Sequence, residues 1–222
     1  YDTLLGPIEA DLTGKDTVAF IPTEGLSYLP MQALAKRGAD GHLHYLVEDK
    51  QIVYLSGIDM DSLLAPRAAS EEGVGLLALG DPTGANLPGA LAEVQAIGKT
   101  YPASQVLSGD QATKKYVLDD GNLNRRILHF ATHGILNARD PLSSYILLAK
   151  DATPGDEQLT MGEVVGMRLD KVDIVTLSAC QTALGQADTG GMEIRSLAKS
   201  FVDAGAQSVV ASLWSVSDDS TK

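Results

Sequence analysis

Two apolar segments of the sequence end on side chains that could carry out nucleophilic chemistry. The run at 126–132 is followed by His133 and Gly134, and the run at 173–179 is followed by Cys180, the only cysteine. A cysteine attacks as the thiolate, and an imidazole beside it can protonate a leaving amine as general acid. Functional side chains of an open parallel sheet collect just beyond the carboxyl ends of its strands. We therefore expect Cys180 and His133 to meet at one sheet edge.

Backbone N–H groups beside this pair could form an oxyanion hole. Gly134 has no side chain that would block its N–H, and the N–H of Cys180 adjoins the attacking sulfur. Removing one such donor typically slows turnover about 10²–10³-fold. The competing interpretation is structural, because a lone cysteine is more often a small core residue and His133 could be a polar strand end. Placement of both residues at strand ends favours catalysis over that alternative.

The other histidines have simpler explanations. His129 lies inside the first run, where we expect a buried histidine with a satisfied ring. His42 and His44 share one face of a short strand and could bind a metal, but exposed surface side chains are the more common case. Four histidines beside one cysteine are poor material for a structural zinc site, so no metal is predicted.

The elements that must position these residues follow from the apolar pattern. Runs rich in Val, Ile and Leu alternate with segments of helical period, which predicts an α/β fold whose mostly parallel sheet is flanked by helices on both faces. Two shorter runs between His44 and Leu55 predict a hairpin. The expected sheet strands cover residues 18–22, 75–79, 126–132, 173–179 and 208–214.

Helices fill the gaps between these strands. One is predicted to bury Ala90 and Val94 and to stop by Pro102. Thr160 followed by Glu163 is a capping-box pattern that begins a short helix. A late helix has apolar residues at helical spacing and can end on a left-handed Gly205; its apolar positions are Ile194, Leu197, Ala198, Phe201 and Val202.

Composition restricts the class of protein. The 222 residues are 44% hydrophobic and carry a formal net charge of −12. Such a chain can fold, and its acidity argues against direct nucleic-acid binding. No apolar run approaches the ~20 residues of a membrane helix, so no membrane contact is expected. One cysteine fits a reducing cytoplasm. Gly73, Gly75 and Gly80 do not make a nucleotide site, because no Gly-Lys-Ser/Thr follows them.

Four stretches of the sequence, in order, carry a family resemblance. They are Gly80-Asp81-Pro82 with Leu87-Pro88 and Glu93-Val94; His129 to Gly134 with Pro141-Leu142-Ser143-Ser144; Leu177 to Thr182; and Ala204-Gly205-Ala206 with Ser212-Leu213-Trp214, Asp218 and Thr221. The sequence resembles the CHAT family (caspase HetF associated with TPRs) of caspase-like cysteine peptidases, relatives of separase. The resemblance implies a caspase-like fold, a His133–Cys180 dyad and no cofactor. His133 and Cys180 are 47 residues apart, close to the ~50 residues that separate His from Cys in caspases.

The resemblance also suggests how a protein or peptide substrate would bind. Peptidases of this kind hold substrate as an added strand, and the edge ending in Trp214 and Val216 is the candidate. Asp218 lies where the separase motif carries an acid that recognises a basic P1 side chain, although it could instead cap a following helix. Metacaspases place an acid two residues before the nucleophile, and here that position is Ser178.

The domain organisation is predicted as an N-terminal part, residues 1–73, and a caspase-like catalytic part, residues 74–222. The family pattern continues past Thr221, so we expect a C-terminally truncated fragment of a longer protein, with tetratricopeptide repeats or a regulatory protein as possible partners. The alternative to an endopeptidase is a catalytically inactive interaction module that keeps the fold. Intact His133, Gly134 and Cys180 argue against that alternative.

Overall fold

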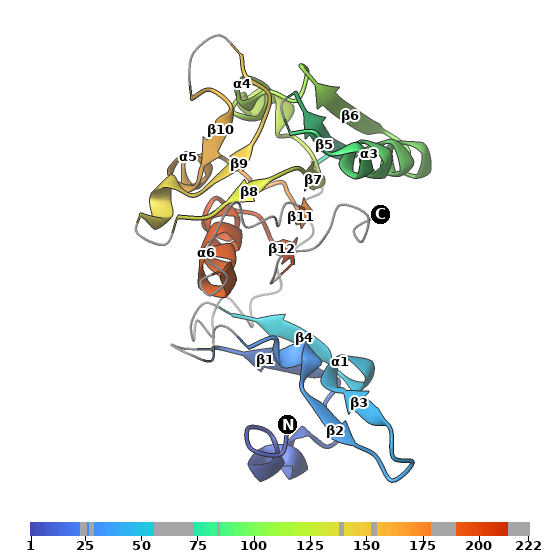
Figure 1. Ribbon diagram of the computed structural model, residues 1–222. Helices are drawn as coiled ribbons and strands as arrows, with labels where there is room; N and C mark the ends of the chain where they lie inside the picture. Colours follow the sequence, from blue (N-terminus) through green and yellow to red (C-terminus); the bar gives the residue numbers. More distant parts are fainter. Residues whose placement is uncertain are drawn as a thin grey trace. The chain divides into compact units, whose positions relative to one another are not determined.

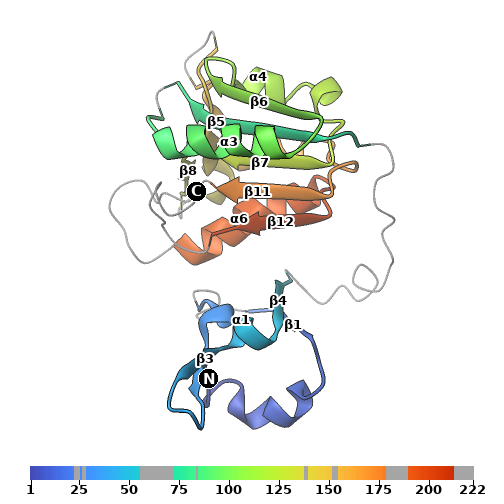
Figure 2. The same ribbon diagram turned by 90° about the vertical axis from the view of Figure 1, so that its right-hand side faces the viewer.

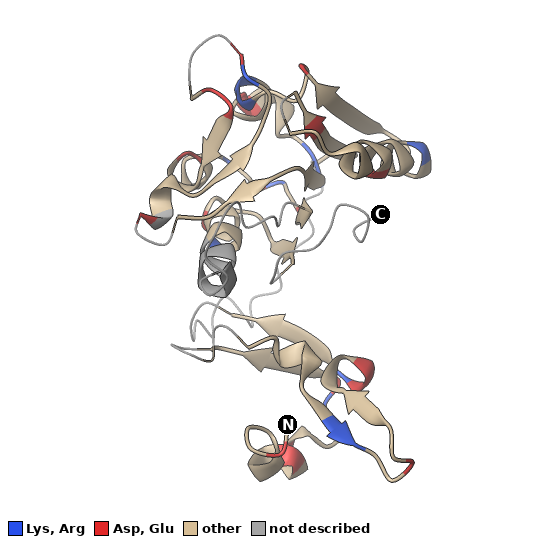
Figure 3. Ribbon diagram, viewed as in Figure 1, with Lys and Arg blue, Asp and Glu red and all other residues tan. Residues whose placement is uncertain are grey.

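The structure, a computed structural model, divides the chain into two units, Tyr1–Pro66 and Arg67–Lys222, which are treated separately (Figure 1). It describes residues 1–22, 26, 29–55, 73–83, 85–137, 140–151, 155–178 and 190–212. No helix among these residues has the length and apolar character needed to cross a membrane. Acidic residues lie in loops and helices of both units (Figure 3).

The N-terminal unit is built from short elements. A 3₁₀ helix η1 (Gly6–Leu12) leads into β1 (Thr17–Phe20), which pairs in parallel with β4 (Gln51–Tyr54). After the 3₁₀ helix η3 (Met31–Ala33), β2 (Ala35–Arg37) and β3 (Leu43–Tyr45) form an antiparallel pair.

The hairpin expected between His44 and Leu55 is wrong. The two runs pair with different strands, because residues Leu46–Asp49 form the helical turn α1 between them. Glu48 accepts a hydrogen bond from the N–H of Tyr45 at 2.9 Å, which starts a helix. Glu48 therefore starts a helical turn where a hairpin would need a β-turn.

The second unit contains the predicted parallel sheet. Its strands lie in the order β12-β11-β7-β5-β6, and every neighbouring pair is parallel. Four of the five strands overlap a predicted run, which confirms the α/β fold class. The sequence did not predict β6, and the run 18–22, predicted as a strand of this sheet, instead forms β1 and pairs with β4 in the N-terminal unit. The bounds are β5 Leu76–Pro82, β6 Ser104–Gly109, β7 Ile127–Ala131, β11 Ile174–Ser178 and β12 Ser208–Ala211. A separate antiparallel sheet joins β8 (Gly134–Ile135), β9 (Tyr145–Leu147) and β10 (Gln158–Thr160).

Helices cover both faces of the parallel sheet, as the apolar strands require. On β5, Leu77 and Leu79 join one core cluster while Leu76 and Ala78 join another. The second cluster is closed by α3 (Pro88–Thr100), and the first by α6 (Gly190–Asp203) with the short helices α4 (Lys114–Val117) and α5 (Met161–Val165). Figure 2 shows α3 in front of the sheet and α6 behind it. Short 3₁₀ turns at η4 (Asp120–Asn122) and η5 (Pro141–Ser143) complete the unit.

The predicted helix signals are confirmed. Helix α3 buries Ala90 and Val94 and ends before Pro102. Thr160 and Glu163 make the reciprocal hydrogen bonds of a capping box. After α6, Gly205 has a φ of 112°, and a Cβ there would lie 2.9 Å from the backbone nitrogen of Asp170. Only glycine fits that close approach.

The strand order creates a place for a functional site. From β5 the chain continues to β6 on one side of it, and the next strand, β7, lies on the other side of β5. The order in which strands join the sheet therefore reverses at β5. Loops leaving two such strands diverge and open a crevice at their carboxyl ends. The residues that follow β5 and β7 are therefore the first candidates for chemistry.

Candidate active site

The backbone of His133 is fixed on two sides. It follows β7, and the preceding Thr132 donates its N–H to the carbonyl oxygen of Ser178 at 3.2 Å. The hydroxyl of Thr132, which is buried, donates to the carbonyl oxygen of Leu147 at 2.8 Å. The carbonyl of His133 accepts the N–H of Leu147, also at 2.8 Å. Strands β11 and β9 thus hold this end of β7 from opposite sides.

The imidazole of His133 points to the loop that follows β5. Its Nε2 lies 2.9 Å from the carbonyl oxygen of Ala85. A carbonyl only accepts, so Nε2 carries the hydrogen, and Nδ1 is the nitrogen left for a second partner. The contact joins the loop after β5 to the residue after β7, the place where the strand order predicts a crevice.

The loop that presents Ala85 is itself held in place. Asp81 accepts the N–H of Leu87 at 2.7 Å, and the N–H of Ala85 donates to the carbonyl of Pro82 at 2.9 Å. Asp81 and Asn86 have positive φ values of 43° and 54°. Aspartate and asparagine tolerate this left-handed conformation better than most residues. Asp81 therefore both tolerates the conformation of this loop and stabilises it through its carboxylate.

Gly134 begins β8, directly after His133. In the antiparallel register Gly134 faces Ile146, and the hydrogen bond from Leu147 to His133 lies beside this pair. Gly134 and Ile146 are therefore a non-hydrogen-bonded pair, in which the N–H of Gly134 points away from β9. This direction suits an oxyanion donor.

Ser178 is the last residue of β11 and lies opposite Ala131 of β7. Its hydroxyl contacts Glu93 Oε2 of α3 at 3.1 Å. Glu93 also approaches His129 of β7, whose Nε2 lies 3.0 Å from Oε1. That separation is within ion-pair distance, but the direction of the ring N–H does not make it a hydrogen bond. The predicted burial of His129 is confirmed, and its ring is less well satisfied than expected.

The remaining predicted site residues lie outside the described residues. These are Cys180, Trp214, Val216 and Asp218. The structure brings the end of β11, two residues before Cys180, beside the end of β7, two residues before His133. The dyad and the substrate-binding roles, including that of Ser178, stay predictions.

Two groups at the candidate site, the Ala85 carbonyl and the Glu93 carboxylate, were not predicted from the sequence as site groups. The acceptor at Ala85 is a backbone carbonyl, which leaves no trace in residue type. Glu93 did leave a signal, because it lies three residues after Ala90 and four before Ile97, on the buried side of the helix. A carboxylate among apolar positions at helical spacing indicates a buried polar contact.

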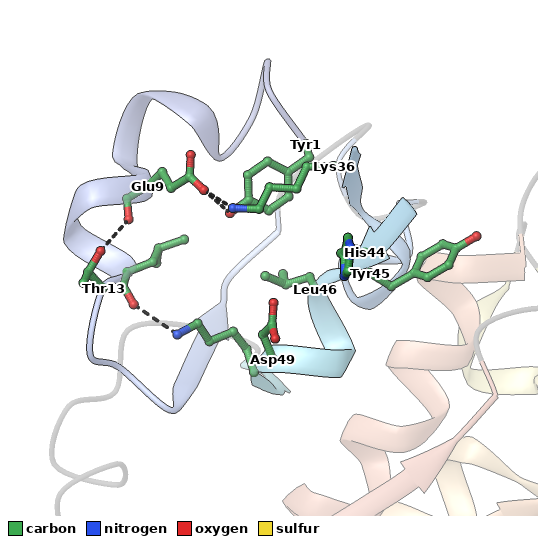
Figure 4. Close-up of a pocket in the computed structure, with 10 residues that line it drawn as sticks. Tyr1, Glu9, Thr13, Lys36, His44, Tyr45, Leu46 and Asp49 are labelled. Carbon is green, nitrogen blue, oxygen red and sulfur yellow. Dashed lines mark hydrogen bonds and ion pairs between the residues drawn. The ribbon is translucent and has the colours of Figure 1, made fainter. Parts of the chain in front are cut away.

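The N-terminal unit contains a separate cavity of about 350 Å³ (Figure 4). Glu9 and Lys36 pair beside it, and the hydrogen bond and charge of Lys36 lower the pKa of Glu9. His44 lies 3.1 Å from both oxygens of Asp40, whose hydrogen bond and charge raise the pKa of His44. Within the described part of the chain, no three side chains are grouped so as to hold a metal ion.

Comparison with known proteins agrees with this architecture. The family model of the CHAT domain matches residues 1–222, the whole chain. No curated protein matches the sequence significantly. With a five-stranded parallel sheet, helices on both faces and a match over its full length, the chain belongs to the caspase-like CHAT domain family.

Proposed function

We propose that the protein is a cysteine endopeptidase with a His133–Cys180 dyad. One observation carries the proposal: the His133 ring is anchored through Nε2 to Ala85, so that Nδ1 is the nitrogen left for a partner at the crevice. Strand β11, which leads to Cys180, ends beside β7 at the same edge of the sheet. A general acid needs this kind of fixed ring orientation.

The proposed reaction has two steps. The thiolate of Cys180 attacks the scissile carbonyl carbon, the C–N bond breaks, and His133 gives a proton to the departing amine. A water molecule then attacks the thioester carbonyl carbon and gives a proton to His133. The C–S bond breaks, the acid product leaves, and the Cys180 thiolate is regenerated beside the protonated His133. The N–H groups of Gly134 and Cys180 stabilise the oxyanion in both steps.

For substrate binding we propose the edge of the sheet at β12. Strand β12 pairs only on the β11 side in the described sheet, and Val210 on it is 58% exposed. An extended peptide can add to such an edge through backbone hydrogen bonds. Trp214 and Val216 would contact the substrate, and Asp218 would select a basic P1 residue. A P1 preference unchanged by Asp218→Ala would overturn this last assignment.

Partners and location are part of the proposal. A cytoplasmic location would keep the single cysteine reduced and nucleophilic. A regulatory protein or attached tetratricopeptide repeats would control access through the loop after β8. There the Asn137 N–H donates to Ser144 Oγ at 2.9 Å, and the Asn137 side-chain amide donates to Ser143 Oγ at 2.8 Å. A fully active isolated chain would contradict such control.

The test compares Cys180 alkylation by iodoacetamide in the native and urea-denatured chain. At pH 6.5 an ordinary thiol is only about 1% thiolate, so a paired thiol should react about ten times faster or more. His133→Ala should remove this excess, while His42→Ala, an exposed histidine of the N-terminal unit, should not. A native rate no faster than the denatured rate would favour the catalytically inactive interaction module.

A further inference from the structure

A carboxylate from α3 links the two strands that lead to the candidate dyad. Glu93 places Oε1 3.0 Å from His129 of β7 and Oε2 3.1 Å from the hydroxyl of Ser178 of β11. The side chains of Glu93 and His129 are only 12% and 8% exposed. His129 and Ser178 lie on the same face of the sheet, which α3 covers, because both alternate with residues of the opposite core cluster.

Glu93 is not needed to close the core. Burying a carboxylate is unfavourable unless partners compensate for the lost water, and an apolar side chain of similar volume often serves as well. The neighbouring Ala90 and Val94 already pack α3 against the sheet. The carboxylate is therefore better explained by what it holds than by the packing it adds.

Glu93 contacts two neighbouring strands, β11 at its last residue and β7 at its middle. Ser178 precedes Cys180 by two residues, and His129 precedes His133 by four. We propose that Glu93 is a positioning residue, which fixes the carboxyl end of β11 against β7 so that the Cys180 thiol is delivered to the His133 imidazole. The inference rests on the proposed dyad and adds a residue to it.

A rival role for Glu93 is direct recognition of a basic substrate side chain near Ser178. The contacts argue against it. One carboxylate oxygen accepts the Ser178 hydroxyl, the other lies 3.0 Å from the His129 ring, and little of the side chain is exposed. Such a role predicts that Glu93→Gln alters the choice of substrate and leaves the reactivity of the thiol unchanged.

The experiment measures Cys180 alkylation by iodoacetamide at pH 6.5 in the whole chain, well below the unfolding temperature of each variant. We expect Glu93→Gln and Ser178→Ala each to lower the rate about tenfold or more, toward that of an ordinary thiol. The double variant should be no slower than either single one, since both break the same link. Ser178→Thr keeps the hydroxyl and should recover most of the rate.

The sign of the Glu93→Gln effect makes the test specific. Removing a negative charge alone would favour the thiolate and raise the rate, so a fall reports lost positioning. Glu163→Gln is the matched control, because Glu163 also contacts a hydroxyl, that of Thr160, and a basic side chain, Lys114, but lies in α5. It should lower the unfolding temperature and leave the alkylation rate unchanged.

The outcomes separate this inference from the proposed function. A fast parent whose rate is the same in Glu93→Gln and Ser178→Ala would overturn the role of Glu93 and keep the dyad. Additive losses in the double variant would also overturn it, because the two residues would then act separately. A parent that reacts like the denatured chain would overturn the dyad and the role of Glu93 together.

Discussion

Asp81 should stabilise the loop that orients His133 in two separable ways. Its carboxylate accepts the N–H of Leu87 at 2.7 Å, and a hydrogen bond to a charged group contributes about 1.5–3 kcal/mol. Its backbone has a φ of 43°, a left-handed conformation that costs most side chains about 1–2 kcal/mol. Substitutions at this one position can therefore distinguish the side-chain contribution from the backbone contribution.

Three variants of Asp81 separate the contribution of its side chain from that of its backbone conformation. Asp81→Ala loses the acceptor and adds strain, so we expect the free energy of unfolding to fall by about 4 kcal/mol. Asp81→Gly loses the acceptor but accepts the backbone, and with the added chain entropy the fall should be about 3 kcal/mol. Asp81→Asn keeps an acceptor and tolerates positive φ, so its fall should stay below about 1 kcal/mol.

Urea unfolding followed by circular dichroism measures these differences. Asp203→Ala, which breaks only an exposed pair with Lys199 in α6, should cost less than about 0.5 kcal/mol and serves as the control. Cys180 alkylation at pH 6.5 should slow in the order Asn, Gly, Ala, because the loop carries the acceptor of His133. Equal stability of the Ala and Gly variants would refute the backbone argument, and three variants as stable as the parent would refute both.

Three further predictions concern pH and the core. The hydrogen bond and charge of Asp40 should hold the pKa of His44 above ~6.5. The stability that this pair contributes is therefore present below pH ~6.5 and lost as the pH rises through the raised pKa. An NMR titration of His44 should show the raised pKa, and Asp40→Asn should abolish the shift. Burial alone would raise the pKa of Glu163, but the hydrogen bonds from Thr160 and Lys114 outweigh it, so the net pKa is lowered. The stability from Glu163 is therefore present above pH ~4.5 and lost as the pH falls through the lowered pKa. Glu163→Gln should flatten the acid side of a curve of Tm against pH. Phe130, fully buried with its ring centroid 5.8 Å from that of Phe201, should cost about 3–5 kcal/mol as Phe130→Ala in urea unfolding, whereas the exposed Val210→Ala should stay within about 0.5 kcal/mol.

The central strands of the parallel sheet were predictable because helices and loops cover both of their faces. That burial demands unbroken apolar runs, and β5, β7 and β11 have them. The helices α3 and α6 were predictable for a related reason, since each must bury one face at helical spacing. Strand pairing in the N-terminal unit was not, because β1 to β4 are only three or four residues long and half exposed. Between two of these strands, Glu48 accepts the N–H of Tyr45 and starts the helical turn α1, where the apolar pattern had predicted a hairpin.

The site was predictable only at the level of which strands carry it. Residue types identified His133 and Gly134, and the register confirms that β7 and β11 are neighbours. The acceptor of the His133 ring could not be found in the same way, because any residue at position 85 has a carbonyl. It depends on the path of the loop, which the left-handed Asp81 and Asn86 fix.

Both anchors of the candidate site come from one short stretch of chain, residues 81–93. Asp81 shapes the loop whose Ala85 carbonyl orients His133, and Glu93, in the helix that follows, contacts the last residue of β11 and the middle of β7. This stretch crosses over from β5 toward β6, so it lies beside the site only because β7 is placed on the other side of β5. The strand order therefore does more than open a crevice: it brings the first crossover of the sheet against the strands that carry the chemistry. A rearrangement of residues 81–93 would consequently change the positions of both the imidazole and the thiol. A substitution that destabilises α6 should change neither position through these contacts.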